Sequence, residues 1–418
     1  MQSKNFWPIL PDADPSGAIL GRHMATTAKK RQEMPINRDV LVWARERVGL
    51  SQDDAAEGVG VKPEQLRQWE SGPKVPTVKQ ARKLAQVYDR PFLEFFSSER
   101  PKIKPLELVP DFRMHREADI PTEHYELLLI QSEAEEIRLN ALDLFEMLGE
   151  QPPILPDAIY GAVTDDVESV AAQARAILGL SIEEQLSLTS VQKDSFVNIL
   201  RSKFEAAGIL VAKNSALARF GGRGMCLFAT PLPLIIFSTE APSAQAFTLA
   251  HELAHVVLKL SAISGPPGFA TPSAKRIEDW CNAFAAAFLI PASALSKIFS
   301  KPPSPLAAIG DAELSSLAKA FAVSRHAMLV RLVNLGYVRP SFYWSIKREE
   351  FLTEETQYKS WGRSKYYGSR YRTSRGDLYT GLVLEAWSNG IITNHSAAEF
   401  MGIKNLAHLE AIRERFRE

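Results

Sequence analysis

This sequence has few cysteines, no formal net charge and no long apolar run. The 418 residues include only two cysteines, Cys226 and Cys281, which are too few for a disulfide framework, so a reducing cytosol is the expected compartment. The formal net charge is zero, which excludes a chain that binds nucleic acid over its whole surface and leaves that role to a local region. No run of about eighteen apolar residues occurs, so no membrane span is expected.

Changes in amino-acid composition along the chain predict several segments. Residues 1–34 lack a basic start followed by an apolar core, so we interpret them as a disordered tail and not as a secretory signal. A compact helical block is predicted for 35–98, followed by a proline- and charge-rich linker with a long helix over 99–154. A second globular domain is expected over 155–340, and a basic, aromatic segment with a small helical tail over 341–418.

Helical periodicity dominates these segments, whereas strands are predicted for only three short apolar runs. These runs are ILVAK, MCLFAT and LPLIIFS, between residues 209 and 238. The stretch SAISGPPGFATPSAK, 261–275, is expected to be a loop, and we find no repeat of fixed period. The expected fold class is therefore α+β, mainly α with a small β-sheet.

The stretch FTLAHELAHVVL, 247–258, carries the first candidate site. His251 and His255 are four residues apart, so on a helix both can point at one ion, and Glu252 lies close enough to touch a water on that ion. A metal lowers the pKa of such a water, and a neighbouring carboxylate can then take its proton. This pattern predicts a zinc hydrolase with Glu252 as general base. The alternative is an ordinary buried helix that contains two histidines.

A third protein ligand is expected from the stretch RIEDWCNAFAAAFLIP, 276–291. Glu278 begins a tightly packed helix, and Asn282 lies one turn further on the same face, where its amide could brace the site. Asp279 points to another face. The alternative for Glu278 is a first-turn acid favoured by the helix dipole. Cys281 is interpreted as a packing residue.

Together these two stretches resemble the ImmA/IrrE family of metallopeptidases. That family pairs HExxH with a downstream E-x-x-[AC]-N-x-[FA]-A-A-x-[FL]-L-[MIV]-P, and both patterns match here without a gap. The resemblance covers about residues 155–340 and implies a zincin-like peptidase domain. It also implies that Zn2+ is bound by His251, His255 and Glu278, with Glu252 as the general base. Ala254 stands where glycine is common in the family.

The stretch LSQDDAAEGVGVKPEQLRQWESG, 50–72, predicts two short helices joined by a tight turn. Its continuation, Leu66 to Thr77, resembles the L-x-x-W-E-x-G-x-x-x-P-T tail of Xre/Cro-type helix-turn-helix domains. Leu66 and Trp69 should point inward. Polar side chains on the exposed face are then expected to contact DNA bases or phosphates: Gln52, Lys62, Gln65, Arg67, Gln68 and Lys74.

One such module binds DNA weakly, so a homodimer on a palindromic operator is expected. The long helix at 123–149 is either a dimer element or an intramolecular packing helix. A helical bundle used only for protein contacts is the alternative to DNA binding.

The stretch YKSWGRSKYYGSRYRTSRG, 358–376, has six basic residues, no acid and five aromatics. Its aromatic and basic side chains could bind single-stranded nucleic acid by stacking, but a loop packed on the rest of the protein is the favoured interpretation.

The sequence thus predicts a cytosolic regulator in which a DNA-reading module and a zinc endopeptidase share one chain. Its substrate would be a specific regulatory protein, since peptidases of the resembled family act on a helix-turn-helix repressor. The alternative is a transcriptional regulator or antitoxin that uses the peptidase-like domain for sensing or for binding a cognate toxin.

Overall fold

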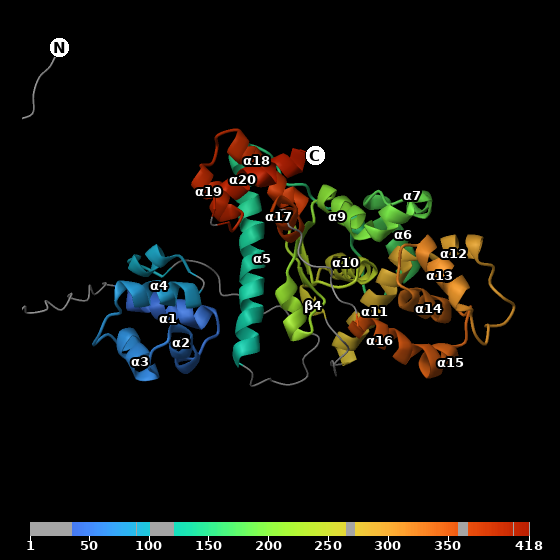
Figure 1. Cartoon of the computed structure of the whole chain (residues 1–418), viewed down its shortest axis with the longest axis horizontal. Coiled ribbons are helices and arrows are strands. Elements are labelled where there is room, and N and C mark those ends of the chain that lie inside the picture. Colours follow the sequence, from blue (N-terminus) through green and yellow to red (C-terminus); the bar gives the residue numbers. More distant parts are fainter. Residues whose placement is uncertain are drawn as a thin grey trace, which may run out of the picture.

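The computed structural model describes residues 36–88, 90–100, 121–264, 272–357, 367–403 and 405–417. Helices dominate, and the described residues form one four-stranded sheet, which confirms the expected α+β class. A compact group of N-terminal helices lies at one end of the molecule and the long helix α5, Pro121–Leu148, stands beside it (Figure 1). The tail 1–34 and most of the linker before α5 lie outside the described residues.

The N-terminal module is a small helical bundle. Its second helix begins after Ser51, whose hydroxyl accepts from the backbone N–H of Asp54 at 3.1 Å, and it ends at Gly60 with φ of 78°. Leu66 and Trp69 are buried, as the sequence predicts. The helices are α1 Arg38–Arg47, α2 Gln52–Val59, α3 Pro63–Ser71, α4 Val78–Val87 and the 3-10 turn η1 Phe92–Phe96.

The sheet has the strand order β1-β3-β2-β4. β1 (Leu210–Lys213) is parallel to β3 (Leu234–Phe237), whereas β2 (Gly224–Leu227) is antiparallel to both of its neighbours. These three strands confirm the predicted strands. β4 (Ala262–Ser264) corrects the loop predicted for 261–275, because its three residues pair with the free edge of β2. A strand this short has no periodicity of its own and forms only where a partner strand is present.

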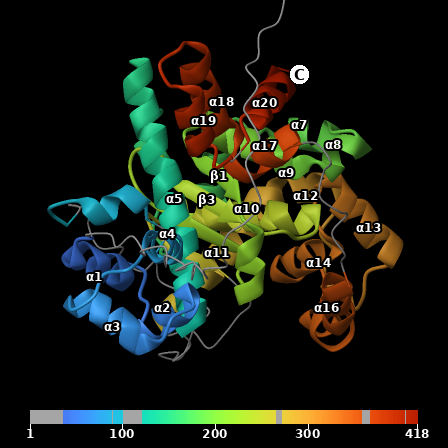
Figure 2. The ribbon, with the colours of Figure 1, turned by 60° about the vertical axis from the view of Figure 1, so that its left-hand side comes forward.

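Helices cover both faces of this sheet. Val211, Ile235 and Phe237 face the core that contains α9 (Phe196–Ala206), α10 and α11. Leu210 and Ile236 face the opposite way, because successive strand residues alternate, and they pack with α5 and α18. The turned view shows α5 across the strands (Figure 2). The bounds of the covering helices are α10 Pro242–Val257, α11 Pro272–Leu289 and α18 Asp377–Ser388.

The remaining helices complete the two layers. Ser195 separates α8 from α9. The others are η2 Asp157–Ile159, α6 Val167–Ile177, α7 Ile182–Ser187, α8 Ser190–Asp194, η3 Ser215–Phe220, α12 Ala292–Ile298, α13 Asp311–Ala320, α14 Arg325–Asn334, α15 Pro340–Phe342, η4 Tyr343–Lys347, α16 Arg348–Gln357, α17 Tyr367–Arg375, α19 Asn394–Phe400 and α20 Ala407–Arg417.

No single helix in the described part of the chain is long and apolar enough to cross a membrane. Only the bent pair formed by Ser273–Leu289 and Ala292–Ile298 has the length and composition to do so. Phe284, Phe288 and Leu295 of that pair are buried in the core that also contains Leu249 and Leu253.

Helix α5 packs within the chain. Leu128 contacts the N-terminal module at Gly49, where a Cβ would lie 3.0 Å from its Cδ1, and Leu129 packs against the core of that module. Leu144 is buried in the core on the outer face of the sheet. Of the two roles considered for the 123–149 helix, this packing matches the intramolecular one. The homodimer stays a prediction.

The described part of the basic, aromatic stretch is α17, which packs against β1 and α20. Arg375 at its end forms an ion pair with Glu133 of α5, with 2.9 Å between Nη1 and Oε1. Residues 358–366 of that stretch lie outside the described residues. The packed interpretation therefore agrees with the part that the structure describes.

The C-terminal helices repeat a local pattern of the N-terminal module that the sequence analysis missed. Residues 51–62 read SQDDAAEGVGVK and residues 393–404 read TNHSAAEFMGIK. In both, a hydroxyl residue caps the helix, and the glycine at the tenth position of the stretch has positive φ, 78° at Gly60 and 64° at Gly402. The next helix differs, because α20 packs against α17 whereas α3 packs against α2. A comparison of the two stretches would have found this likeness.

Glu205 of α9 forms hydrogen bonds with the N-terminus of α18. Its Oε1 and Oε2 accept from the backbone N–H of Asp377 at 2.9 and 3.1 Å, at the N-terminus of α18. Gly376 has φ of +86°, and a Cβ there would lie 2.1 Å from Oε1, so the carboxylate occupies the space that a side chain would need. Burial raises the pKa of Glu205 to about 7, although Arg201 and the backbone donors lower it.

We expect Glu205 to make the stability of the fold pH-dependent. Between its ordinary pKa of 4.5 and about 7 the folded chain holds a proton that the unfolded chain releases, so the free energy of unfolding falls as pH rises through this window. The shift corresponds to a loss on the order of 3 kcal/mol. Glu205→Gln, which cannot ionise, should flatten this part of the profile. Urea denaturation at about pH 5 and about pH 8 measures it.

The matched control for this change is Glu313→Gln on the exposed face of α13, which should keep the wild-type pH profile. If Glu205→Gln and Glu313→Gln lose stability equally between the two pH values, the buried carboxyl does not titrate in that range.

Candidate metal centre and nucleic-acid interface

Helix α10 presents three polar side chains in the middle of an apolar core. Pro242 stands at its first turn, and Leu249, Leu253 and Val256 are fully buried, so packing determines which way the helix faces. His251 keeps 6% of its surface exposed, whereas Glu252 and His255 keep none. Polar groups this deep need partners, because burial without hydrogen bonds is costly.

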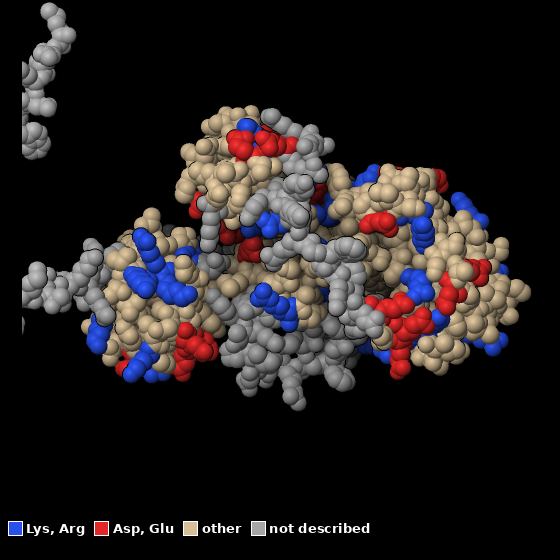
Figure 3. Space-filling view, viewed as in Figure 1, with Lys and Arg blue, Asp and Glu red and all other residues tan. Residues whose placement is uncertain are grey.

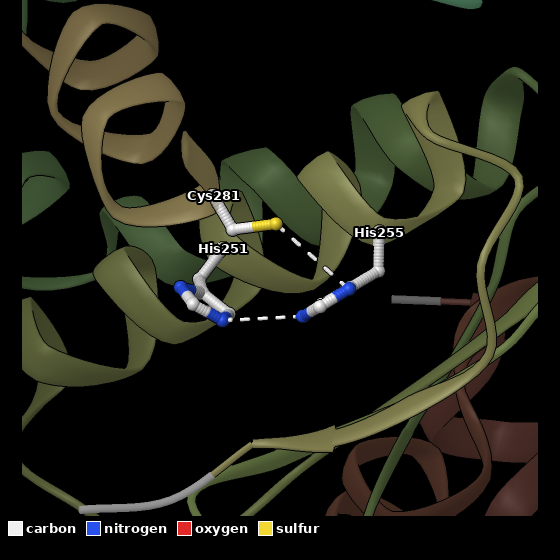
Figure 4. Close-up of side chains that lie close together, drawn as sticks. All are labelled: His251, His255 and Cys281. Carbon is white, nitrogen blue, oxygen red and sulfur yellow. Dashed lines mark hydrogen bonds between the residues drawn. The ribbon is translucent and has the colours of Figure 1, made fainter. Parts of the chain in front are cut away.

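The structure brings His251, His255 and Glu278 together. Nε2 of His251 lies 3.3 Å from Nε2 of His255. One oxygen of Glu278, Oε2, lies 3.2 Å from Nε2 of His251, and the other, Oε1, lies 3.2 Å from Nε2 of His255. The two rings turn these nitrogens toward each other (Figure 4). Two ligands about 2.1 Å from one ion at a tetrahedral angle lie about 3.4 Å apart, so the three groups have the spacing of a metal ligand set.

Two neighbouring residues of α11 orient the histidine rings. Asn282 Oδ1 lies 3.1 Å from Nδ1 of His251, and Cys281 Sγ lies 3.8 Å from Nδ1 of His255. A histidine that donates from Nδ1 keeps the lone pair of Nε2 for a metal. Asn282 therefore lies where the sequence analysis expected it, whereas the contact of Cys281 was missed. Its position one residue before Asn282 was the available signal.

Cys281 also forms a candidate ligand cluster with His251 and His255. We favour Glu278 as the third group for two reasons. Cys281 faces Nδ1 of His255, on the opposite edge of the ring from the atoms that face His251 and Glu278. Burial also raises the pKa of its thiol, so the thiolate that binds metals is disfavoured.

The carboxylates fit a cation. The oxygens of Glu252 are buried and make no well-formed hydrogen bond, although the Ser264 hydroxyl stabilises the charged form, and Oε1 of Glu278 lies 3.2 Å from Nε2 of His255. Burial raises the pKa of Glu252 to about 8. Burial also opposes ionisation of Glu278, but hydrogen bonds and charges from the two histidines outweigh it and lower its pKa to about 2. A divalent ion would compensate this buried negative charge.

Gly224 of β2 leaves the space in which the Glu252 carboxylate lies. A Cβ at this position would lie 2.2 Å from Oε1 and 2.6 Å from Cδ of Glu252. Because Glu252 is fully buried, its side chain cannot move out into solvent to make room for that Cβ. Sequence reasoning missed this contact, since it joins residues 28 positions apart in two different elements.

We expect Gly224→Ala to destabilise the fold by about 1–3 kcal/mol through overpacking. Adding Glu252→Asp shortens the opposing side chain by one methylene and should restore much of that loss. Gly310→Ala, where a Cβ meets nothing within 4 Å, is the matched control and should be close to neutral. Thermal unfolding of the four proteins measures this. If the double variant is no more stable than Gly224→Ala, the contact with Glu252 does not cause the loss of stability.

Several expected DNA contacts are already engaged within the N-terminal module. Arg67 is half-exposed, and its guanidinium lies 2.8 Å from Asp53 Oδ1 and 3.5 Å from Glu64 Oε2. Gln52 donates to Glu70 at 2.7 Å, and Gln68 donates to Glu64 at 3.5 Å. These contacts hold the three side chains on α2 and α3, so DNA would have to compete with intramolecular acids.

The other expected contacts lie at the surface of this module. Lys62 and Lys74 are exposed, and Gln65 is half-buried. Lysine and arginine gather over α4, whereas acidic residues gather near α2 (Figure 3). The exposed basic residues of α4 are Lys79, Arg82 and Lys83.

Comparison with known families agrees with both parts of this structure. Residues 41–95 match the helix-turn-helix family, and residues 204–333 match the IrrE N-terminal-like domain, a peptidase family. No curated protein and no solved structure matches the chain. The fold and the two matches define a DNA-binding regulator with a peptidase-like domain. More particularly, the chain combines an N-terminal Xre-like helix-turn-helix with an ImmA/IrrE-like domain, which confirms both resemblances.

Proposed function

We propose that this chain is a regulatory zinc endopeptidase of the cytosol that cleaves a specific protein and is joined to a DNA-reading module. One observation carries the proposal: the Nε2 atoms of His251 and His255 lie 3.3 Å apart and each lies 3.2 Å from an oxygen of Glu278, next to the fully buried carboxylate of Glu252. Structural zinc sites use four protein ligands, whereas catalytic sites use three and keep one position open.

In this proposal His251, His255 and Glu278 hold Zn2+, and Asn282 and Cys281 keep both imidazoles oriented through Nδ1. When bound, Zn2+ supplies a Lewis acid that polarises a peptide carbonyl and makes water more acidic. Glu252 takes the proton of the attacking water and then delivers it to the nitrogen of the leaving amine.

The proposal is tested by mapping protein termini in cells. Cells that produce the wild-type chain should contain new termini in one or a few proteins, and cells that produce the His251→Ala, His255→Ala double variant should not. The double variant must accumulate to the wild-type level for this comparison. If the two sets of termini are the same, the chain does not act as a peptidase.

A second candidate function is a transcriptional regulator or antitoxin whose peptidase-like domain binds a partner such as a cognate toxin. The packing of α5 against both the N-terminal module and the sheet supports this candidate, because one helix then links partner binding to DNA binding. A toxin gene beside this one favours the antitoxin, whereas a lone repressor gene favours the peptidase.

For DNA, we propose that the module reads an operator as a homodimer, with α3 in the major groove. Gln65 and Arg67 would contact base edges, and Lys62 and Gln68 would support them. Gln52 and Lys74 would contact phosphates. The exposed Lys62 at the start of α3 supports this arrangement, because positive residues at the recognition helix strengthen binding to the DNA backbone.

We expect Arg67→Ala to relax the sequence preference for the operator, at a cost of about 1–3 kcal/mol if the side chain meets a base. The net cost should lie near the lower end, because Arg67 must first leave Asp53 and Glu64. Lys74→Ala should weaken binding to all sequences alike. Gel shifts with the operator and with a scrambled site measure both effects. Equal losses on the two DNAs for Arg67→Ala would exclude its base contact.

A further inference from the structure

Ser264 of β4 places a hydroxyl group beside the candidate metal centre. Its Oγ lies 3.3 Å from Nε2 of His255, the same nitrogen that faces His251 and Glu278. The residue is buried, with 5% of its surface exposed, and a hydroxyl buried in this way needs a partner. Sequence reasoning gave Ser264 no role, because it lies in the stretch that was predicted to be a loop.

The pairing of β4 with β2 brings this side chain next to Glu252. Ser264 is paired with Gly224, and its carbonyl oxygen accepts from the backbone N–H of Arg223 at 2.9 Å. Residues directly opposite each other on antiparallel strands project to the same face, with Cβ atoms about 4.5–5.5 Å apart. The Cβ position of Gly224 is the space that the Glu252 carboxylate fills. The Ser264 side chain and this carboxylate therefore lie on the same side of the sheet.

The Ser264 hydroxyl has two acceptors beside it, Nε2 of His255 and the carboxylate of Glu252. Burial raises the pKa of Glu252, and the Ser264 hydroxyl is among the groups that lower it. A serine hydroxyl has one hydrogen, so it donates to one of the two acceptors at a time. The lone pair of Nε2 is also the one that binds a metal ion. In a loaded centre the carboxylate is therefore the acceptor that remains for Ser264.

We propose that Ser264 is a positioning residue of the candidate metal centre, whose hydroxyl donates to Glu252 and keeps this carboxylate directed at the ligand set. This inference rests on the proposed peptidase function, in which Glu252 accepts the proton of a water. The terminal torsion of a glutamate is broad, so a carboxylate without a fixed donor samples several orientations. Gly224 leaves the room for the carboxylate, and Ser264, its partner across the strands, supplies the fixed donor.

Zinc binding distinguishes a positioning residue from a ligand. Ser264→Ala should keep its zinc affinity within about a factor of ten of the wild type, because His251, His255 and Glu278 all remain. His255→Ala, which removes a ligand, should lose far more. Competition between the purified full chain and a chromophoric chelator for Zn2+ measures both. A loss beyond that factor in Ser264→Ala would make Ser264 a metal ligand or the partner of one, and would overturn its action on Glu252.

The rate at which new protein termini appear in cells tests the action of Ser264 through Glu252, with all variants at equal levels. Ser264→Ala should lower this rate on the order of tenfold to a hundredfold, the typical effect of losing a hydrogen bond to a charged group. Ser264→Thr keeps the hydroxyl and should restore most of the rate. In the Glu252→Gln variant, Ser264→Ala should cause no further loss, because the carboxylate that it positions is already gone.

Ser261→Ala is the matched control, because it removes another hydroxyl from the same segment of the chain. The Ser261 hydroxyl accepts from the backbone N–H of Phe228 at 2.9 Å, and its removal should leave the rate at the wild-type level.

Three results overturn the role of Ser264. A wild-type rate in Ser264→Ala, together with a loss in Glu252→Gln, overturns this role and leaves the peptidase in place. An equal loss from Ser264→Ala in the wild type and in the Glu252→Gln variant means that Ser264 does not act through Glu252. Absence of new termini in cells that produce the wild-type chain overturns the peptidase function itself, and the role of Ser264 with it.

Discussion

Replacing His255 with alanine should reduce the zinc content of the purified chain from about one ion to almost none. His255 Nε2 lies 3.3 Å from His251 Nε2 and 3.2 Å from Glu278 Oε1, so it belongs to the ligand set that we propose. Two remaining ligands bind zinc poorly, and binding free energy is lost with each ligand. Elemental analysis after dialysis against a weak chelator measures the content. His395→Ala, at an exposed position, is the control and should keep the ion.

The same measurement distinguishes Glu278 from Cys281 as the third ligand. Cys281→Ser should retain most of the zinc, because Sγ contacts Nδ1 of His255 and lies away from the Nε2 atoms. Equal zinc in the wild type and in the His251→Ala, His255→Ala double variant would contradict the site altogether. Loss of zinc in Cys281→Ser, together with retention in Glu278→Gln, would instead assign the site to the two histidines and the cysteine.

Replacing Glu252 with glutamine should abolish most cleavage while leaving zinc in place. The amide has nearly the same shape as the carboxylate, so the fully buried position is preserved, but it cannot accept the proton of a water. General acid–base catalysis typically contributes about a hundredfold to ten-thousandfold, so the rate should fall by at least that range. Zinc content and cleavage of a co-expressed target, identified from its new termini, are the two measurements.

Glu278→Gln should behave differently from Glu252→Gln. An amide is a poorer zinc ligand than a carboxylate, so zinc content should fall together with cleavage. Glu410→Gln, at an exposed position on α20, is the matched control for both. If Glu252→Gln changes the cellular phenotype no more than Glu410→Gln does, the chain regulates by binding, and the antitoxin or sensor function replaces the peptidase.

Local sequence was sufficient for the elements that carry the candidate chemistry. The helix α10 follows from its apolar spacing, and His251 and His255 share a face because they are four residues apart on it. Ser51, Pro63 and Gly60 mark the ends of α2 and α3 by capping preferences that act over three or four residues. These predictions depend only on near neighbours, which is why a single sequence contains them.

The sequence also indicated that Glu278 and Asn282 would lie near the histidines, although they are on another helix. Helix spacing put Asn282 one turn after Glu278 on the same face, and the resemblance of two stretches to one family paired Glu278 with the histidines. The structure places Glu278 at 3.2 Å from both Nε2 atoms and Asn282 at 3.1 Å from Nδ1 of His251. The contact of Cys281 with His255 was not foreseen, because nothing local distinguishes a buried thiol that packs from one that orients an imidazole.

The sequence by itself determined the fold class, the helix-turn-helix and the helix that carries His251 and His255, because capping and periodicity are properties of consecutive residues. The tertiary structure alone decided that β4 forms on the edge of β2, and that α5 and α18 cover the outer face of the sheet. It also decided that Gly224 makes room for Glu252 and that acids hold Arg67. These features join segments distant in the chain, and only the packing of a whole core selects one such pairing among many.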